Sequence, residues 1–356
     1  MQLHNFNAGP CHLPEDVIKQ ASEAVLDFDH TGLSLLEVSH RGPHFTAVME
    51  EARHLARELM QLEDDFEVLF LHGGGRTQFL EVALNLLDAD QKAAYINTGT
   101  WSTKAIEEAR LYGQVVEIAS SKDKQFTYIP KDYTIPGDAS YLHITTNNTI
   151  FGTQYQTIPN SPVPLIADMS SDILSRDLDF NQFGIIYAGA QKNIGAAGVT
   201  FVAVRKSLLG KVKRPIPAIM DYQVHMDYKS MYNTPPVFAV YVCLLNLRWL
   251  KAQGGVKAIE AVNNKKARML YAEIDRNPLF SGTVMPEDRS RMNVCFVMEN
   301  PELEAAFLGF SKDQGLLNIK GHRSVGGFRV SLYNAITVES VQTLIAAMQH
   351  FAQKKG

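Results

Sequence analysis

Cysteine is scarce in this chain of 356 residues, which contains only Cys11, Cys243 and Cys295 and no Cys-x-x-Cys spacing. This scarcity argues against a disulfide framework and against a zinc site built from thiolates, and it fits a reducing cytosol. The eleven histidines include no His-Glu-x-x-His pair. We therefore expect no bound metal.

Long apolar runs and an excess of basic charge are also missing. No run approaches the roughly 20 apolar residues that crossing a bilayer requires, and the first residues lack the pattern of a signal peptide. The net charge of −4 creates no basic field for nucleic acid or for an anionic membrane. We expect a cytoplasmic protein with neither of these partners.

The composition that remains is that of a globular protein, with 46% hydrophobic and 20% charged residues. The length suits one large domain and one smaller domain. We expect a large domain at 15–255, a small C-terminal domain at 256–356, and an extended segment at 1–14 that packs near the small domain.

Short apolar segments alternate with helical patterns in the first part of the chain, which predicts an α/β domain with a mostly parallel sheet. The expected strands are 66–71, 93–97, 115–118, 141–145, 165–168 and 199–204. The expected helices of this part are 45–60, 78–87, 104–111 and 237–253. Later segments predict helices at 256–276, 302–314 and 338–353 and strands within 292–298 and 319–332, an α+β pattern.

Lys192 lies between two of the apolar segments, next to small residues. Apolar surroundings penalise the ammonium and lower its pKa, which makes a lysine nucleophilic and able to form a Schiff base with a carbonyl. For this residue alone, a solvated lysine on a turn is the commoner situation.

A glycine loop follows the expected strand 66–71 and precedes a helix, in the order His72-Gly-Gly-Gly-Arg76. This order offers backbone N–H groups and a helix N-terminus to a phosphate. The loop lacks the Gly-Lys-Ser/Thr of a Walker loop and the glycine spacing of the dinucleotide fingerprint. A simple tight turn is the alternative, and Arg76 favours the phosphate site.

Three further residues would complete a site for pyridoxal phosphate on Lys192. A carboxylate must face the pyridine nitrogen, and Asp168 ends a strand 24 residues earlier. Trp101 could cover the ring and Thr149 could bond its oxygen. Each has an ordinary alternative: a helix cap for Asp168, a core position for Trp101 and a turn for Thr149.

Two His-Arg dipeptides, His40-Arg41 and His322-Arg323, lie in glycine-containing loops far apart in the sequence. A phosphomonoester carries close to two negative charges and three acceptor oxygens, and arginine and histidine supply matching charge and directional donors. Each dipeptide alone is more often a surface loop. Together with the cofactor set, the pairs predict an anion site.

The chain resembles the phosphoserine aminotransferases, in the class V branch of the fold-type I pyridoxal-phosphate enzymes, over nearly its whole length. The matching segments are Phe6-Asn-Ala-Gly-Pro10, Ser39-His-Arg-Gly-Pro43, Leu71-His-Gly-Gly-Gly-Arg-Thr-Gln-Phe79, Asn97-Thr-Gly-Thr-Trp-Ser102, Ala167-Asp-Met-Ser-Ser171, Gly189-Ala-Gln-Lys-Asn-Ile-Gly195, Asn233-Thr-Pro-Pro236 and Gly321-His-Arg-Ser-Val-Gly-Gly-Phe-Arg329. Eight segments in the family's order are a specific signal. Ala196 stands where the family often has proline.

The resemblance implies a role for each site residue. Lys192 would carry pyridoxal 5'-phosphate as a Schiff base and act as general base and acid, with Asp168 as the pyridinium partner. The other cofactor contacts would be Gly75, Arg76, Trp101, Thr149 and Gln191, with Asn233 and Thr234 from the second subunit of a homodimer. The substrate contacts would be Arg329 for the α-carboxylate and His40, Arg41, His322 and Arg323 for the second anionic group.

The implied reaction transfers the amino group of glutamate to 3-phosphohydroxypyruvate, giving phosphoserine and 2-oxoglutarate in serine biosynthesis. In many bacteria the same family also serves pyridoxal phosphate synthesis through a phosphorylated hydroxythreonine, and the sequence leaves this second role open.

Three other functions are alternatives to this transamination, and each makes a different demand on the sequence. A cysteine desulfurase needs a reactive cysteine in the loop before the last strand, where 318–325 has none, and Cys295 lies in an apolar strand. An alanine- or serine-glyoxylate aminotransferase would not need both His-Arg pairs. A non-catalytic α/β protein that binds a phosphorylated ligand remains the alternative from another class, and it would bind no coloured cofactor.

Overall fold

The computed structural model describes residues 2–355, and its largest element is a seven-stranded sheet. In spatial order its strands are β2 (Phe66–Gly73), β8 (Gly198–Arg205), β7 (Ile185–Gly189), β6 (Leu165–Asp168), β5 (Leu142–Thr145), β3 (Lys92–Asn97) and β4 (Gln114–Ser120). Only β8 runs antiparallel to its neighbours in this sheet. The predicted α/β class with a mostly parallel sheet is confirmed.

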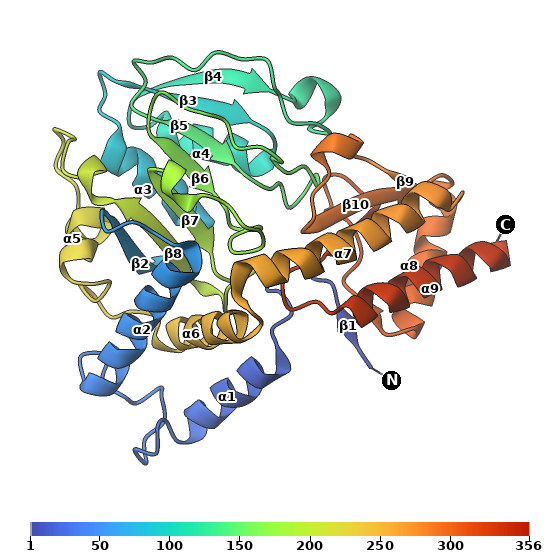
Figure 1. Ribbon diagram of the computed structural model, residues 1–356. Helices are drawn as coiled ribbons and strands as arrows, with labels where there is room; N and C mark the ends of the chain where they lie inside the picture. Colours follow the sequence, from blue (N-terminus) through green and yellow to red (C-terminus); the bar gives the residue numbers. More distant parts are fainter. Residues whose placement is uncertain (1, 356) are drawn as a thin grey trace.

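Helices cover both faces of this sheet (Figure 1). One face carries α2 (Pro43–Met60) and α6 (Val237–Ala252), and the other carries α3 (Gly75–Leu86), α4 (Thr100–Ala109) and α5 (Tyr222–Asp227). Strand β2 shows why both faces must be covered. Its side chains alternate between the two cores, with Val68 and Phe70 in the first and Leu69 and Leu71 in the second.

The remaining elements build a second, smaller core. Strand β10 (Asn293–Met298) lies between β9 (Phe280–Gly282) and β12 (Phe328–Ser331) in an antiparallel sheet. Helices of the same part are α7 (Gly255–Arg276), α8 (Glu304–Asp313) and α9 (Val338–Lys355). Four phenylalanines dominate this core, namely Phe280, Phe296, Phe307 and Phe328.

The N-terminal segment joins this smaller core before the chain enters α1 (Glu15–Leu26). Strand β1 (His4–Asn5) pairs in parallel with β11 (Leu316–Leu317), and Phe6 is fully buried among the apolar side chains of the second core. These separate cores support the proposed division into 15–255, 256–356 and an N-terminal segment, except that Val256 and Ile259, near the start of α7, pack in the first core.

Some helix starts differ from the sequence-based expectation. Helix α3 begins at Gly75 instead of residue 78, and α4 begins at Thr100 instead of residue 104. The first turns are Gly75-Arg-Thr in α3 and Thr100-Trp-Ser-Thr in α4, and neither shows an apolar periodicity although the backbone is helical. Strands β1, β9 and β11 were not predicted, because two or three residues are too short to show an alternation.

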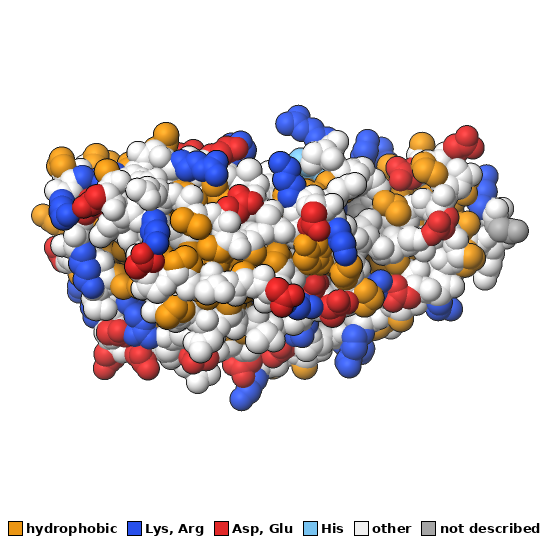
Figure 2. All heavy atoms as spheres, turned by 90° about the horizontal axis from the view of Figure 1, so that it is seen from above, with side chains coloured by type: hydrophobic (Ala, Val, Ile, Leu, Met, Phe, Trp, Pro, Cys, Tyr) orange, Lys and Arg blue, Asp and Glu red, His pale blue; other side chains and the backbone are white. Residues whose placement is uncertain are grey.

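The carboxyl ends of β2, β3, β5, β6 and β7 meet at one edge of the large sheet. Ligands of parallel sheets bind at such an edge. On the molecular face in Figure 2, basic and acidic side chains are interspersed, and neither sign dominates it. Within residues 2–355, no helix has the length and apolar character needed to cross a membrane.

Candidate active site

A cavity of about 280 Å³ opens at the carboxyl edge of the large sheet. Its walls come from loops that follow the strands and from the first turns of α3 and α4. The lining residues are Gly74, Gly75, Arg76, Phe79, Trp101, Asp168, Ser170, Gln191 and Lys192. Six residues of the predicted cofactor set therefore line one cavity.

Lys192 lies in the turn between β7 and β8, three residues beyond the end of β7. Its Nζ donates a hydrogen bond of 2.7 Å to Thr149 Oγ1. Burial lowers the pKa of Lys192 to about 8, while the negative charge of Asp168 acts in the opposite direction. More of this side chain is neutral amine near pH 7 than in an ordinary lysine, and the amine is the nucleophilic form.

The N-terminal segment packs against the stem of this lysine. A Cβ atom added at Gly9 would lie 3.5 Å from Lys192 Cγ, so the backbone of residue 9 is in contact range of the side chain. Tyr333 Oη donates to the carbonyl oxygen of Ala8 over 2.9 Å. The covering segment is thus held by the part of the chain that follows β12.

Asp168 is the last residue of β6, between β5 and β7, and is only 4% exposed. The amide of Ser170 donates to its Oδ1 over 2.9 Å. Burial raises the pKa of Asp168, and the positive charge of Lys192 opposes this rise. A buried carboxyl group therefore lies in the same cavity wall as the lysine.

Trp101 lies in the first turn of α4 with two cations around its indole. Lys192 Nζ and Arg76 Cζ each lie 5.6 Å from the ring centroid. The indole Nε1 is buried and has no hydrogen-bond partner within residues 2–355. A buried N–H group without an acceptor is costly, and a polar ligand in the cavity could relieve it.

The start of α3 brings backbone N–H groups to the cavity. A Cβ atom at Gly75 would lie 3.1 Å from Ser170 Oγ, so glycine lets the two segments approach closely. Gly73 has φ +94°, and a Cβ there would meet Thr77 Oγ1. The free N–H groups of a helix N-terminus beside Arg76 suit a phosphate.

The lining fits pyridoxal phosphate part by part. An amine for the aldehyde, a carboxyl group for the pyridine nitrogen, an aromatic face for the ring and an anion site for the phosphate all border the same cavity. The unpartnered indole N–H adds a donor that no protein group uses.

Thr149 connects this cavity to the smaller sheet. Its hydroxyl accepts from Lys192, and its carbonyl oxygen accepts from Arg329 Nη1 over 3.3 Å. Arg329 lies in β12, opposite Cys295 of β10. The structure therefore brings Thr149, Lys192 and Arg329 together, as the sequence predicted for a site that binds cofactor and substrate.

His322 and Arg323 lie in the loop before β12. His322 Nδ1 and Ser324 Oγ are 2.7 Å apart. Partial burial lowers the pKa of His322, and the positive charges of Arg329 and Arg323 lower it further. Arg323 and Arg329 therefore place two positive charges near His322, whose lowered pKa favours the neutral imidazole.

Besides Thr149, Arg329, His322 and Arg323, four more predicted residues are absent from the cavity lining. His40 and Arg41 precede α2, where Arg41 is exposed and His40 Nε2 is buried without a partner within residues 2–355. Asn233 Nδ2 lies 3.1 Å from His72 Nδ1, and Thr234 is exposed. Within residues 2–355, none of these four residues lines the cavity that contains Lys192.

Sequence reasoning gave no role to two lining residues, Phe79 and Ser170. Ser170 lies two residues beyond the end of β6, and its hydroxyl accepts from the Gly189 amide over 3.1 Å. The signal that could have found it is its place directly after Asp168. Phe79 belongs to the apolar face of α3, where a cavity residue and a core residue have the same pattern.

Comparisons with known proteins agree with this geometry. A family profile described as aminotransferase class-V matches residues 3–344. A relative from Bacteroides thetaiotaomicron named phosphoserine aminotransferase is 57% identical over 353 residues, covering 99% of both chains.

Two solved structures support the same assignment of the fold. Phosphoserine aminotransferase from Bacillus circulans subsp. alkalophilus has a TM-score of 0.97 at 42% identity and covers 100% of this chain and 99% of its own. The PLP-bound enzyme of that name from Trichomonas vaginalis has a TM-score of 0.93 at 36% identity and covers 98% of this chain and 100% of its own.

Proposed function

The chain belongs to the class-V aminotransferase family, and we propose that it transfers an amino group from L-glutamate to 3-phosphohydroxypyruvate with pyridoxal phosphate as cofactor. The products are O-phospho-L-serine and 2-oxoglutarate, a step of L-serine biosynthesis. The observation that carries the proposal is the cavity that Lys192 and Asp168 share with the N-terminus of α3. The names of the relatives at 51–57% identity support the substrate pair.

Pyridoxal phosphate supplies an aldehyde that captures amines and a ring that accepts electrons from the substrate α-carbon. Asp168 would hold a proton on the pyridine nitrogen, and Trp101 would pack on the ring. Thr149 would donate to the ring oxygen. The phosphate contacts are Gly75, Arg76 and Gln191, whose positions in the cavity wall support this role.

Lys192 would hold the aldehyde of the cofactor through its Nζ. The same Nζ would take the proton from the substrate α-carbon and return a proton, as general base and general acid. Its lowered pKa supports both roles, because a group that titrates near the working pH can accept and donate. The N-terminal segment over the lysine stem keeps water from that side.

Arg329 binds the substrate α-carboxylate, a bidentate match between guanidinium and carboxylate. His322 and Arg323 bind the substrate phosphate, and their position next to Arg329 supports this assignment. His40 and Arg41 act on the same phosphate.

The protein acts as a homodimer with its active sites at the subunit interface. Asn233 and Thr234 of one subunit contact the cofactor phosphate of the other, and the absence of both from the cavity lining within one chain supports this arrangement. Phe238, four residues beyond Thr234, is an exposed apolar side chain, and so are Leu33 and Leu36 in the segment before His40; these side chains also support an interface. We place the dimer in the cytoplasm.

A spectrum and a set of specificity constants test this function. Protein with added pyridoxal phosphate is expected to gain a visible absorbance band and to turn over phosphoserine with 2-oxoglutarate. Phosphoserine should exceed serine by a large factor in kcat/KM, and phosphohydroxythreonine in the same assay tests the second role. Protein that stays colourless, or that uses serine equally well, would overturn the proposal.

A further inference from the structure

The loop from Asn147 to Ile150 is the only described segment that contacts both Lys192 and Arg329 through hydrogen bonds of one residue, Thr149. The loop follows β5 and lies against one face of the small sheet. Arg329 and Cys295 of that face both reach its backbone, since Cys295 Sγ lies 3.4 Å from the Ile150 carbonyl oxygen. The separation of the two cationic groups therefore depends on where this loop sits.

A pair of buried asparagines fixes the loop on the small sheet. Asn147 Nδ2 donates to Asn293 Oδ1 over 2.7 Å. Asn293 is the first residue of β10 and has no exposed surface, while Asn147 is 2% exposed. Their side chains join residues that are 146 positions apart.

The side chain of Asn293 also makes hydrogen bonds within the small sheet. Its Nδ2 donates to Ser331 Oγ over 3.0 Å and to Tyr333 Oη over 3.2 Å. Ser331 is its register partner in β12, two residues beyond Arg329. The side-chain amide of Asn293 therefore binds both the Thr149 loop and β12, the strand that carries Arg329.

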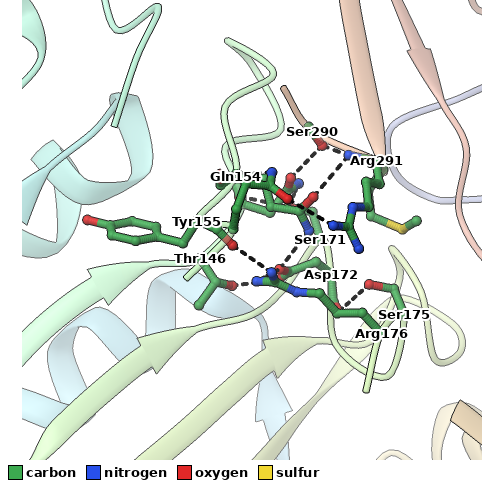
Figure 3. Close-up of polar contacts among 12 residues, drawn as sticks. Thr146, Gln154, Tyr155, Ser171, Asp172, Ser175, Arg176, Ser290 and Arg291 are labelled. Carbon is green, nitrogen blue, oxygen red and sulfur yellow. Dashed lines mark hydrogen bonds and ion pairs between the residues drawn. The ribbon is translucent and has the colours of Figure 1, made fainter. Parts of the chain in front are cut away.

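Asn147 is satisfied by the large sheet and by the segment before β10. Its Nδ2 donates to Ser171 Oγ over 2.8 Å, and its Oδ1 accepts from Ser290 Oγ over 2.5 Å. Ser171 lies three residues beyond Asp168. Figure 3 labels Ser171 and Ser290 among the polar contacts of this region.

A second buried cluster, centred on Asp172, binds the residues on either side of the Thr149 loop. Asp172 accepts from Thr146 Oγ1 over 2.5 Å, from Gln154 Nε2 over 3.1 Å and from Arg176 Nη2 over 3.2 Å. The Arg291 amide donates to Gln154 Oε1 over 3.0 Å, as Figure 3 shows. Thr146 and Gln154, on the two sides of the loop, are therefore both bound to Asp172, which lies four residues beyond Asp168.

We propose that Asn147 and Asn293 are positioning residues that set the distance between Lys192 and Arg329 by fixing the Thr149 loop. The inference rests on the proposed function, because Arg329 is its carboxylate-binding residue. Buried amides with every partner in place select one geometry, whereas apolar side chains would allow the two sheets to slide. A displacement of about 1 Å in such a site is enough to slow a reaction strongly.

The variant Asn293→Ala tests this role, because it removes the bond to the loop without touching the cavity. The α-carboxylate is common to phosphoserine and glutamate, so KM should rise by a similar factor for both, roughly tenfold for the lost hydrogen bond to Asn147. The lost bonds to Ser331 and Tyr333 should lower the stability of the small sheet. The absorbance of the bound cofactor should be retained. Asn147→Ala is expected to give the same pattern, and the double variant should lose less than the product of the two single effects.

Asn263→Ala is the matched control. Asn263 is another buried asparagine at the junction, 1% exposed, and donates to the Ser175 carbonyl oxygen over 2.9 Å and to Asn334 Oδ1 over 2.8 Å. Within residues 2–355, its side chain makes no hydrogen bond to the Thr149 loop. A merely structural role would give all three variants lowered thermal stability and unchanged KM, and that result would overturn the inference.

The outcomes separate the two proposals. If the wild-type protein turns over both substrates and KM stays unchanged in both loop variants, the positioning role is wrong and the function stands. If the wild-type protein with bound cofactor turns over neither substrate, the function fails and the inference with it. Should Asn293→Ala not fold, Asn147→Ala decides the question by the same KM comparison.

Discussion

Lys192 donates a 2.7 Å hydrogen bond from Nζ to the hydroxyl of Thr149. The lysine amine that would carry the cofactor is therefore already held toward one of its expected ring contacts. Because the same threonine also binds Arg329 through its carbonyl oxygen, the parts for cofactor and substrate meet at a single residue.

Lys192→Ala is expected to abolish transamination. The variant loses both the covalent attachment and the base that moves the α-proton, and the base alone contributes about 100-fold to 10,000-fold. Single-turnover kinetics with phosphoserine and added pyridoxal phosphate measure the loss. Lys104→Ala, at an exposed position of α4, is the control and should keep full activity. Substantial turnover by Lys192→Ala would refute the assignment of the base.

Incorporation of pyridoxal phosphate should accelerate with rising pH, with a midpoint near the lowered pKa of Lys192, about 8. Only the neutral amine attacks the aldehyde, so the rate rises as the ammonium loses its proton and levels off above that pKa. The negative charge of Asp168 favours the ammonium and raises this pKa. Asp168→Asn should therefore move the midpoint to lower pH.

Stopped-flow absorbance of the cofactor-free protein measures this profile. Asp123→Asn, at an exposed position in the segment after β4, provides the control and should leave the midpoint in place. An upward shift in Asp168→Asn would contradict the electrostatic argument.

Arg323→Ala should raise KM for phosphoserine far more than for glutamate. A charge-assisted hydrogen bond contributes about 1.5–3 kcal/mol, which corresponds to roughly tenfold to 100-fold. Arg41→Ala is expected to behave in the same way, and Lys312→Ala, at an exposed position in the same part of the chain, should change neither constant. The glutamate side-chain carboxylate reduces the contrast if it uses the same arginines. Equal losses for both substrates would mean that these arginines do not select the phosphate.

A mixed dimer tests whether Asn233 and Thr234 act across subunits. Lys192→Ala and Thr234→Ala are each expected to be impaired as homodimers, Thr234→Ala through weaker cofactor binding. In a heterodimer of the two variants, one active site would combine the intact Lys192 with an intact Thr234 from the partner. Recovered activity after mixing and refolding supports sharing of the site, and a mixture no more active than its parts argues against it.

Lys266→Met should destabilise the protein by about 3 kcal/mol, because it leaves three buried carbonyl oxygens without donors. Lys266 has no exposed surface, and its Nζ donates over 2.9 Å to the carbonyl oxygens of Leu332, Tyr333 and Ile336. Denaturant unfolding measures the change, with the exposed neighbour in Lys265→Met as control.

The same lysine gives stability a pH dependence. Burial lowers the pKa of Lys266 from 10.5 to about 7. Between these values the unfolded chain binds a proton that the folded chain does not, so the free energy of unfolding should rise with pH across this window. In Lys266→Met this contribution disappears. If the free energy of unfolding of the wild-type protein fell between pH 7 and 10.5 relative to that of the variant, this contribution of Lys266 would be excluded.

The sequence predicts the site well where local patterns suffice. Apolar runs mark the buried strands, and the polar residue that ends each run, such as Asp168, then lies at the edge of a parallel sheet. The same logic places Lys192 and Trp101 near Asp168. The family resemblance adds Arg329, Gln191 and the homodimer, which no local pattern reveals.

Other features have no local signal. The bond between Asn147 and Asn293 joins two segments whose asparagines look like ordinary turn and strand-end residues. Strand β1 has two residues and pairs with β11 more than 300 positions away. Such contacts form when distant segments of the chain pack together. A pattern of apolar residues within a short window therefore cannot predict them.

The contact of Gly9 with Lys192 has a consequence for folding. The segment that covers the lysine is held at Ala8 by Tyr333, across a sequence separation of 325 residues. Chains are synthesised from the N-terminus and fold as they emerge, and contacts of such high sequence separation form slowly. The large sheet can therefore assemble with Lys192 still open to water, and the cofactor aldehyde would have its easiest access before the smaller core closes over this segment.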